Sequence, residues 1–216
     1  MTDDFPVYEA PAIEADPHRV KQMFETNVFG LFNMVTAFTP LLIAATSKDA
    51  PAPIVVNVAS VLSRLPMPFG SGYNATKAAV VSYSDTLRLE LEPLGIKVLT
   101  LFMGEVSTAL MMPDNVHFGK DSLYADLEPK VKERSTTHAR DSIKTGPFAK
   151  QVVHQVLATA PSSYIWKGTN AFLVWLLNAV GPRKVFDSTI KKASGLDDPI
   201  LVGKVYARAH NTTRQK

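Results

Sequence analysis

The fold of this chain is decided by residues 54–102, where two apolar runs flank a helical segment. The first run is Ile54-Val55-Val56-Asn57-Val58, the helical segment covers residues 73–91, and the second run is Ile96-Lys97-Val98-Leu99-Thr100-Leu101-Phe102. Short β-branched runs of near-continuous apolarity are typical of parallel strands covered on both faces. Pro93-Leu94-Gly95 ends the helical segment. The alternation predicts a strand–helix–strand unit of a parallel α/β sheet with a right-handed crossover.

The segments on either side extend the same alternation. Asp16-Pro17 is a helix start, and apolar residues then recur at three and four positions up to about residue 45. Beyond Gly104 the pattern weakens, and residues 111–145 predict loop and short helix. A helix over 147–159, a short strand over 164–166 and an apolar helix over 171–180 follow. We expect one domain over 1–216, with a catalytic core at 16–108 and a substrate-binding and C-terminal region at 109–216.

Composition narrows the functional classes. The 216 residues are 46% hydrophobic, which suits one globular domain, and the absence of cysteine excludes disulfides and thiolate chemistry. The five histidines show no metal-ligand spacing, so no metal site is expected. The net charge is +3, and the basic excess lies near the C-terminus. A solvated tail is the first interpretation, and attraction to an anionic membrane surface is the second. No motif accompanies the charge that would indicate nucleic-acid binding.

A candidate acid–base group lies at the start of the predicted central helix. Tyr73 and Lys77 are four residues apart and therefore share one helix face. A lysine ammonium beside a tyrosine phenol lowers the phenol pKa, and such a tyrosine can exchange a proton with a substrate oxygen. Ser60 follows the first strand, at the edge where α/β sheets bind ligands, and can orient that oxygen. Asn27 interrupts the apolar face of the first helix; alone it would indicate only a buried asparagine bonded to backbone.

Four segments together resemble the short-chain dehydrogenase/reductase family. They occur in order and at the family's spacing: Glu25-Thr26-Asn27-Val28-Phe29-Gly30, Ile54-Val55-Val56-Asn57-Val58-Ala59-Ser60, Tyr73-Asn74-Ala75-Thr76-Lys77-Ala78-Ala79 and Gly104-Glu105-Val106-Ser107-Thr108. A weaker match, over Tyr164-Ile165-Trp166-Lys167-Gly168 and the apolar helix after it, is similar to fungal 1-acyldihydroxyacetone-phosphate reductases.

The resemblance implies a role for each matched residue. Tyr73 would be the general acid or base, Lys77 would lower its pKa and bind the nicotinamide ribose, and Ser60 would hold the carbonyl oxygen. Asn27 would support a proton-relay water at a helix irregularity. Val106 and Thr108 would face the carboxamide and phosphate of NADP, the implied cofactor. The family has Pro-Gly before this last segment where this chain has Met103-Gly104, which puts the shape of that turn in question.

The resemblance also implies an N-terminal half that the sequence does not contain. Family members carry a Gly-x-x-x-Gly-x-Gly turn, which lets the backbone approach the cofactor pyrophosphate, and a later Asn-Asn-Ala-Gly segment. Neither motif occurs here. We therefore expect an N-terminally truncated member, the C-terminal part of a Rossmann-type doubly wound parallel sheet lacking the first βαβαβ half. The strand at residue 54 would then be an exposed edge, and such edges promote association. We expect either an oligomer that covers this edge or a poorly stable monomer.

Three functions fit these observations. The first is an oxidoreductase that reduces a carbonyl of a lipid or secondary metabolite with NADPH, and that is impaired or partner-dependent without the dinucleotide-binding half. The second is a cofactor-independent acid–base enzyme, an isomerase, dehydratase or cyclase, in a biosynthetic pathway. The third is a non-catalytic partner of a full-length relative, because the helices bearing Asn27 and Tyr73 commonly form the family's dimer interface. A homo- or hetero-oligomer through those two helices is expected.

The apolar helix Ala171–Val180 has two interpretations. Packing in the core or lining of a substrate tunnel is the first. Peripheral membrane contact is the second, with Phe172, Trp175 and Leu176 in the interface and Arg183 and Lys184 on headgroups. The acidic start of the chain is not a signal peptide, and no run reaches the about 18 apolar residues of a membrane span. We expect a cytoplasmic protein, with the surface of the endoplasmic reticulum or lipid droplets as an alternative.

Overall fold

A computed structural model describes residues 7–108, 110 and 113–213. Its centre is a three-stranded parallel sheet in the order β1-β2-β5, formed by Ile54–Ser60, Lys97–Met103 and Tyr164–Lys167. Strands β1 and β2 pair in register from Ile54 with Lys97 to Ser60 with Met103. The predicted parallel α/β fold is confirmed, and β1 extends two residues beyond its predicted end. A separate two-stranded parallel pair joins β3 (Val106–Ser107) to β4 (Ile143–Lys144).

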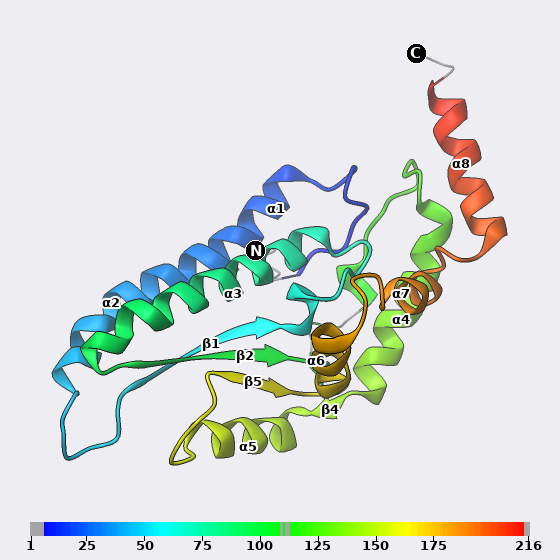
Figure 1. Cartoon of the computed structure of the whole chain (residues 1–216). Helices are drawn as coiled ribbons and strands as arrows, with labels where there is room; N and C mark the ends of the chain where they lie inside the picture. Colours follow the sequence, from blue (N-terminus) through cyan, green and yellow to red (C-terminus); the bar gives the residue numbers. More distant parts are fainter. Residues whose placement is uncertain (1–6, 109, 111–112, 214–216) are drawn as a thin grey trace.

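Helices cover both faces of the sheet (Figure 1). One face carries α3 (Ser71–Leu91) and a long helix made of α1 (Pro17–Phe24), a π-helical turn (Glu25–Phe29) and α2 (Gly30–Ala44). The other face carries α5 (Thr145–Val156), which begins two residues before its predicted start. The remaining helices lie toward the carboxyl ends of the strands: α4 (Glu128–Asp141), α6 (Ala171–Val180), α7 (Asp187–Ser194) and α8 (Pro199–Thr213).

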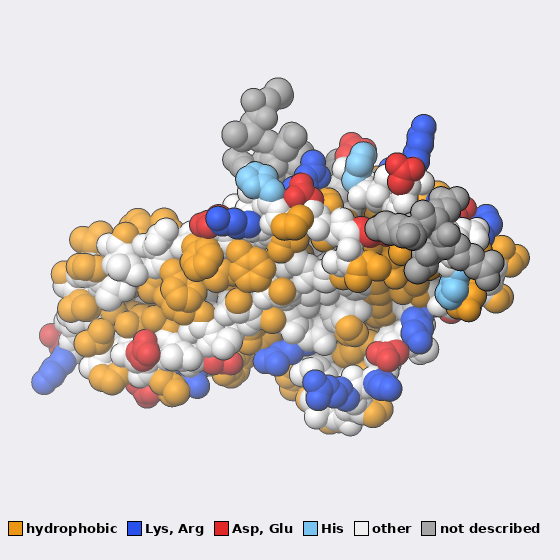
Figure 2. Space-filling view, turned by 90° about the horizontal axis from the view of Figure 1, so that it is seen from above, with side chains coloured by type: hydrophobic (Ala, Val, Ile, Leu, Met, Phe, Trp, Pro, Cys, Tyr) orange, Lys and Arg blue, Asp and Glu red, His pale blue; other side chains and the backbone are white. Residues whose placement is uncertain are grey.

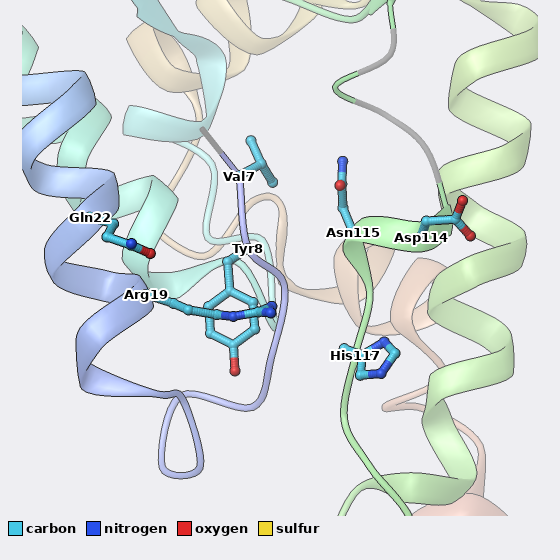
Figure 3. A pocket seen from close by; sticks show the side chains of 7 residues that line it. All are labelled: Val7, Tyr8, Arg19, Gln22, Asp114, Asn115 and His117. Carbon is cyan, nitrogen blue, oxygen red and sulfur yellow. The ribbon is translucent and has the colours of Figure 1, made fainter. Parts of the chain in front are cut away.

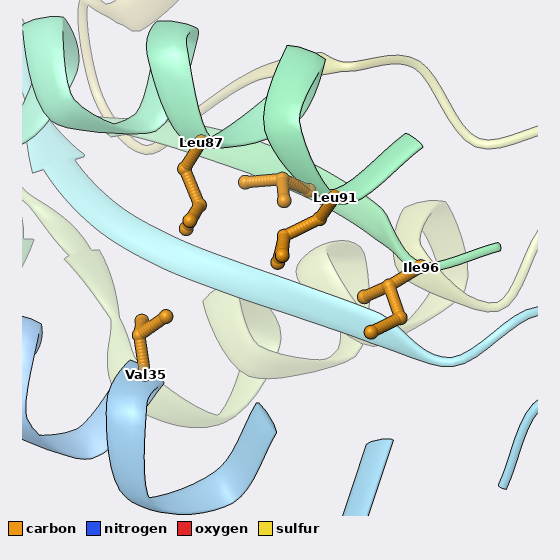
Figure 4. Close-up of a cluster of buried hydrophobic side chains, with 5 residues drawn as sticks. Val35, Leu87, Leu91 and Ile96 are labelled. Carbon is orange, nitrogen blue, oxygen red and sulfur yellow. The ribbon is translucent and has the colours of Figure 1, made fainter. Parts of the chain in front are cut away.

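Packing on the sheet face that carries α2 and α3 explains why these two helices lie side by side. Val35 of α2 meets Leu87 and Leu91 of α3 in one buried cluster with Ile96 and Val98 (Figure 4). Each fully buried aliphatic side chain of this kind contributes about 1.5–3 kcal/mol relative to exposure. On the opposite face Leu99, Leu101 and Ile165 pack against side chains of α5. The sheet is therefore held between two helical layers, as its near-continuous apolar strands predict.

Strand β1 is an edge strand in the part of the chain that the structure describes, where its ladder partner is β2. Val58 in its middle is 41% exposed. The expected exposed edge is therefore present.

The segment between β3 and α5 is more regular than predicted. Residues 128–141 form the 14-residue helix α4, in a region where the sequence predicts loop and short helix. The helix is strongly polar and buries only Val131, Arg134 and Ser135, so the sequence has no apolar periodicity there that would predict a helix.

The basic C-terminal region forms helix α8 up to Thr213, whereas Arg214 and Lys216 lie outside the described residues. Leu201 and Val205 of α8 pack on a cluster that includes Leu127, and both Lys204 and Arg208 form ion pairs with Asp126, at 3.3 and 2.6 Å. Part of the basic excess is therefore neutralised within the chain.

The long N-terminal helix corrects one prediction from the sequence. Among the described helices, Pro17–Ala44 is long and apolar enough to cross a membrane by length and composition. Its most apolar 18-residue window is 11% buried. The helix packs on α3 and β1. Its exposed apolar side chains include Met34, Phe38 and Leu41.

Candidate active site

Ser60 and Tyr73 meet at the carboxyl end of β1. Ser60 is the last residue of β1, is buried, and accepts a hydrogen bond from the Leu62 amide at 3.1 Å, which starts a short 3₁₀ turn. Tyr73 lies in the first turn of α3, is also buried, and lines one cavity together with Ser60. The structure therefore brings together the two residues that the sequence selects.

The protonation of Tyr73 differs from the sequence-based expectation. Burial raises the pKa of the Tyr73 phenol, and the hydrogen bond with Ser60 opposes this rise. The Lys77 ammonium instead donates to the Val58 carbonyl oxygen at 3.0 Å and lies 5.6 Å from the centroid of the Tyr73 ring. Burial lowers the pKa of Lys77. Tyr73 is therefore held as a neutral phenol, the form that donates a proton.

Asn27 lies in the π-helical turn Glu25–Phe29, so the expected helix irregularity is confirmed. Its side-chain amide donates to the Thr76 hydroxyl at 3.2 Å, and that hydroxyl donates to the Tyr73 carbonyl oxygen at 2.8 Å. Single π-helical turns inside α-helices are frequent at functional sites. Asn27 is thus linked to the helix turn that carries Tyr73, and its part in a proton relay stays a prediction.

The segment after β2 reaches the same site. Gly104 packs so tightly that a Cβ there would lie 2.3 Å from the Thr169 carbonyl oxygen. Backbone bonds in both directions join Glu105 to Thr169, at 3.0 and 3.1 Å. Val106 and Thr108 line one cavity together with Ser60 and Tyr73. The residues expected to face the cofactor are therefore next to the acid–base pair.

This cavity has a volume of ≈ 370 Å³, which is within the range of small-molecule sites. Much of its wall is apolar and comes from α6, α7 and the segment between them: Leu173, Val174, Leu177, Phe186 and Ile190. Lining by α6 was the first interpretation of that helix. Residues from both predicted regions, 16–108 and 109–216, form the cavity.

Sequence reasoning missed the charged side chains of this cavity. Glu9, Glu105, Arg134 and His138 also line it. Arg134 and His138 are four residues apart on α4 and so share one face. Because the sequence does not predict this helix, the spacing alone does not place the two side chains together. Among the described residues, no group of three or more His, Asp or Glu side chains gathers as a metal ion would require.

A second, smaller cavity of ≈ 170 Å³ lies between the N-terminal segment, α1 and the loop after β3 (Figure 3). Arg19 stacks over Tyr8, with its guanidinium carbon 5.1 Å from the ring centroid, while Asn115 and His117 stand on the facing segment. Ser60 and Tyr73 do not line this cavity.

Comparison with known proteins agrees with the site. Residues 8–117 match the family model of the short-chain dehydrogenases. The short-chain dehydrogenase virD of Hypocrea virens is 36% identical over 185 residues, covering 83% of this chain and 61% of that protein. The short-chain dehydrogenase srdE of Neurospora crassa is 34% identical over 183 residues, covering 83% and 60%. The chain belongs to the short-chain dehydrogenase family.

Solved structures show the same fold. A short-chain dehydrogenase from Streptomyces avermitilis superposes with a TM-score of 0.64 at 22% identity, covering 88% of this chain and 67% of that one. A Burkholderia cenocepacia short-chain dehydrogenase in complex with NADP gives 0.56 at 22% identity, covering 85% and 65%. The chain spans about three fifths of the length of the first two fungal relatives.

Proposed function

We propose that this chain forms the catalytic part of an NADP-dependent oxidoreductase that reduces a carbonyl of a lipid or secondary metabolite. The observation that carries the proposal is that Ser60 and Tyr73 lie together in the wall of a largely apolar cavity. An apolar cavity with a few converging polar groups is the usual form of a small-molecule site.

The chain's own residues supply the proton chemistry. The Ser60 hydroxyl donates a hydrogen bond to the substrate carbonyl oxygen and holds it beside the Tyr73 phenol. Because burial keeps Tyr73 protonated, its hydroxyl proton can pass to that oxygen as negative charge develops there, which leaves Tyr73 as a phenolate. Lys77, anchored on the Val58 carbonyl oxygen, keeps a positive charge near the tyrosine ring. NADPH, when bound, supplies the hydride to the carbonyl carbon.

The residues present fit one end of NADPH better than the other. Val106 and Thr108 border the space next to Tyr73, which suits the nicotinamide end. The sequence contains no glycine-rich turn of the kind that brings backbone amides to a diphosphate. We therefore propose that this chain alone binds NADPH weakly, and that turnover is impaired or depends on a partner chain.

Two measurements test the proposal. Calorimetric titration with NADPH should give weak binding, and reduction of a ketone panel with NADPH should fall by about 10²–10⁴-fold on Tyr73→Phe, the range of general acid catalysis. Ser82→Ala on the exposed side of α3 serves as the control. Reduction that survives Tyr73→Phe would place the chemistry elsewhere, and no NADPH oxidation with any partner or ketone would remove the redox function.

A second candidate is cofactor-independent acid–base catalysis, because the acid–base pair is assembled entirely from this chain. Ser60, Tyr73 and the cavity around them require no nucleotide for proton transfer, enolisation or dehydration. Product formation without NADPH that is lost in Tyr73→Phe would favour this function over reduction.

Association through α2 and α3 is the third part of the proposal. Six large apolar side chains in the π-turn and α2 are exposed: Phe29, Phe32, Met34, Phe38, Leu41 and Ile43. Figure 2 shows hydrophobic side chains gathered at the end of the molecule that α2 and α3 form. A contiguous apolar surface of this kind marks a protein interface. The partner is a second copy of this chain or a longer relative, and in the latter case the chain can serve as a non-catalytic subunit.

We also propose that α6 rests on an anionic lipid surface, which would place the cytoplasmic protein at an internal membrane. Only Ala171 and Val174 of α6 are buried, while Phe172, Trp175 and Val180 are 67%, 41% and 75% exposed. Arg183 and Lys184 follow directly and are exposed. Apolar and aromatic side chains flanked by basic ones suit an interfacial helix.

Binding to vesicles of phosphatidylcholine and phosphatidylserine tests the placement of α6. Trp175→Glu should abolish sedimentation with these vesicles, while Leu157→Glu, which follows α5 and is 75% exposed, should not. Wild-type protein that stays in solution, or equal losses in both variants, would refute the membrane contact.

A further inference from the structure

The cavity beside Ser60 and Tyr73 has two chemically different walls. The apolar wall comes from α6 and α7 and includes Leu173, Leu177 and Ile190. The charged wall consists of Glu9 and Glu105 with Arg134 and His138 of α4. Proton transfer from Tyr73 requires none of these four side chains.

Arg134 is buried and its charge is already matched. Its side chain is 6% exposed, forms an ion pair with Glu9, and donates from Nη1 to the Ser194 hydroxyl at 3.3 Å. Burial raises the pKa of Glu9, but the adjacent guanidinium opposes this rise. The Glu9 side chain is paired with the Arg134 guanidinium, so Arg134 has no unpaired charge with which to bind an anion.

Among the described residues, Glu105 has no cationic partner comparable to Arg134. Its Oε1 accepts from the Asn170 amide at 3.2 Å and its Oε2 from the Ser142 hydroxyl at 3.4 Å. The His138 Nε2 lies 3.8 Å from Oε1. Burial lowers the pKa of His138, although Glu105 opposes this shift, so the imidazole is neutral near pH 7. By formal count, with Glu9 and Glu105 as carboxylates and Arg134 as a guanidinium, the charged wall has a net charge of −1.

We propose that this wall is a subsite for an uncharged, hydrogen-bonding substituent of the substrate, an alcohol or phenol hydroxyl, and that it rejects anionic ketones. The proposal rests on the proposed function, because it assigns the substrate class of the same cavity. A hydroxyl can donate to Glu105 and accept from His138, which satisfies polar groups that an entirely apolar ligand would leave unpaired.

A carboxylate or phosphate would be disfavoured for two reasons. It would approach Glu105 in a cavity of low dielectric, where repulsion between like charges is strong, and it would lose its hydration without gaining a free cation. The charge count therefore argues against an acylated dihydroxyacetone phosphate, the compound that gives the fungal reductases of the weaker sequence match their name.

Three ketones of one skeleton test the subsite. Binding of 1-tetralone, 6-hydroxy-1-tetralone and 6-carboxy-1-tetralone to the whole chain is measured by calorimetry or ligand-observed NMR at pH 7. We expect the hydroxy ketone to bind most tightly, with the carboxylate at least about tenfold weaker, a free-energy difference of about 1.4 kcal/mol. Glu105→Gln should reduce this difference in affinity, because the carboxylate ketone should bind more tightly. Glu9→Gln, which leaves the Arg134 charge unmatched, should do the same.

Glu133→Gln is the matched control, because Glu133 lies on α4 with its side chain 65% exposed to solvent. It should leave all three affinities unchanged. Equal binding of the three ketones, tightest binding of the carboxylate, unchanged selectivity in both cavity variants, or no binding of any ketone would each overturn the subsite.

The readout is binding, so it is separate from redox turnover. NADPH-dependent reduction with equal binding of the three ketones would refute the subsite but not the proposed function. Selective binding of the hydroxy ketone without any NADPH oxidation would refute the proposed redox function but not the subsite.

Discussion

Replacing Ser84 with alanine should loosen the contact between the helix that carries Tyr73 and the strand that carries Ser60. The Ser84 hydroxyl on α3 accepts from the Asn57 side-chain amide of β1 at 2.9 Å and donates to the Val80 carbonyl oxygen at 2.7 Å. Ser84 is 0% exposed and Asn57 is 3% exposed. In Ser84→Ala the Asn57 amide loses this acceptor in a buried place, and an unsatisfied buried polar group costs about 1–3 kcal/mol.

Helix propensity must be separated from the lost hydrogen bond. Alanine is favoured over serine in a helix by about 0.5 kcal/mol, which masks part of the loss. Ser82→Ala shares this gain, because Ser82 lies in the same helix but is exposed. The difference between the two variants therefore isolates the Asn57–Ser84 contact, and Ser84→Ala should be less stable by about 1–3 kcal/mol.

The assay is urea denaturation of both variants, followed by circular dichroism at one protein concentration because association is expected. The slope of unfolding free energy against urea should match between the variants, since the fold is the same. A difference below about 0.5 kcal/mol, the level of ordinary surface substitutions, would refute the buried bond as a tie between helix and strand.

Three further predictions concern the turn, the charged wall and the exposed helix. Gly104→Ala should destabilise the chain by about 1–3 kcal/mol in the same urea assay, because its Cβ would meet backbone, whereas Gly146→Ala has open space and should not. Burial lowers the pKa of His138 in the folded protein below the ordinary value of 6.5. The melting temperature should therefore rise as the pH increases from that lowered pKa to about 6.5. His138→Gln should remove this part of the rise, whereas the control His154→Gln, at an exposed position, should keep it. Leu41→Glu, at a position 66% exposed on α2, should convert an oligomer to monomer in light scattering, and an unchanged mass would refute association through this face.

The elements with strong apolar patterns could be predicted from the sequence. The strands at residues 54 and 96, the helix between them and Ala171–Val180 all occur close to their predicted bounds. Helix α4 could not, because its buried residues include Arg134 and Ser135 and are too few to create a period. Its burial is decided by contacts with distant segments, such as the ion pair with Glu9 and the hydrogen bond to Ser194.

The candidate site divides in the same way. Ser60 and Tyr73 could be found because strand end and helix start place them together, and Val106 and Thr108 because a known pattern marks them. The direction of the Tyr73 pKa shift could not be predicted from the sequence. Helix spacing puts Lys77 on the correct face, but the Val58 carbonyl oxygen on the exposed strand edge attracts its ammonium. Burial of the phenol, a property of the packed structure, then decides the shift.

The proposed carbonyl reduction takes its proton and its hydride from different sources. The groups that we propose for the proton are in this chain: Ser60, the buried Tyr73 and the Asn27–Thr76 contact beside its helix turn. The proposed hydride donor is a nucleotide, and this sequence contains no glycine-rich turn of the kind that brings backbone amides to a diphosphate. Proton transfer and hydride transfer should therefore respond differently when a partner is added. A partner that restores NADPH binding should raise reduction while leaving the protonation of Tyr73 unchanged, because burial within this chain sets that protonation.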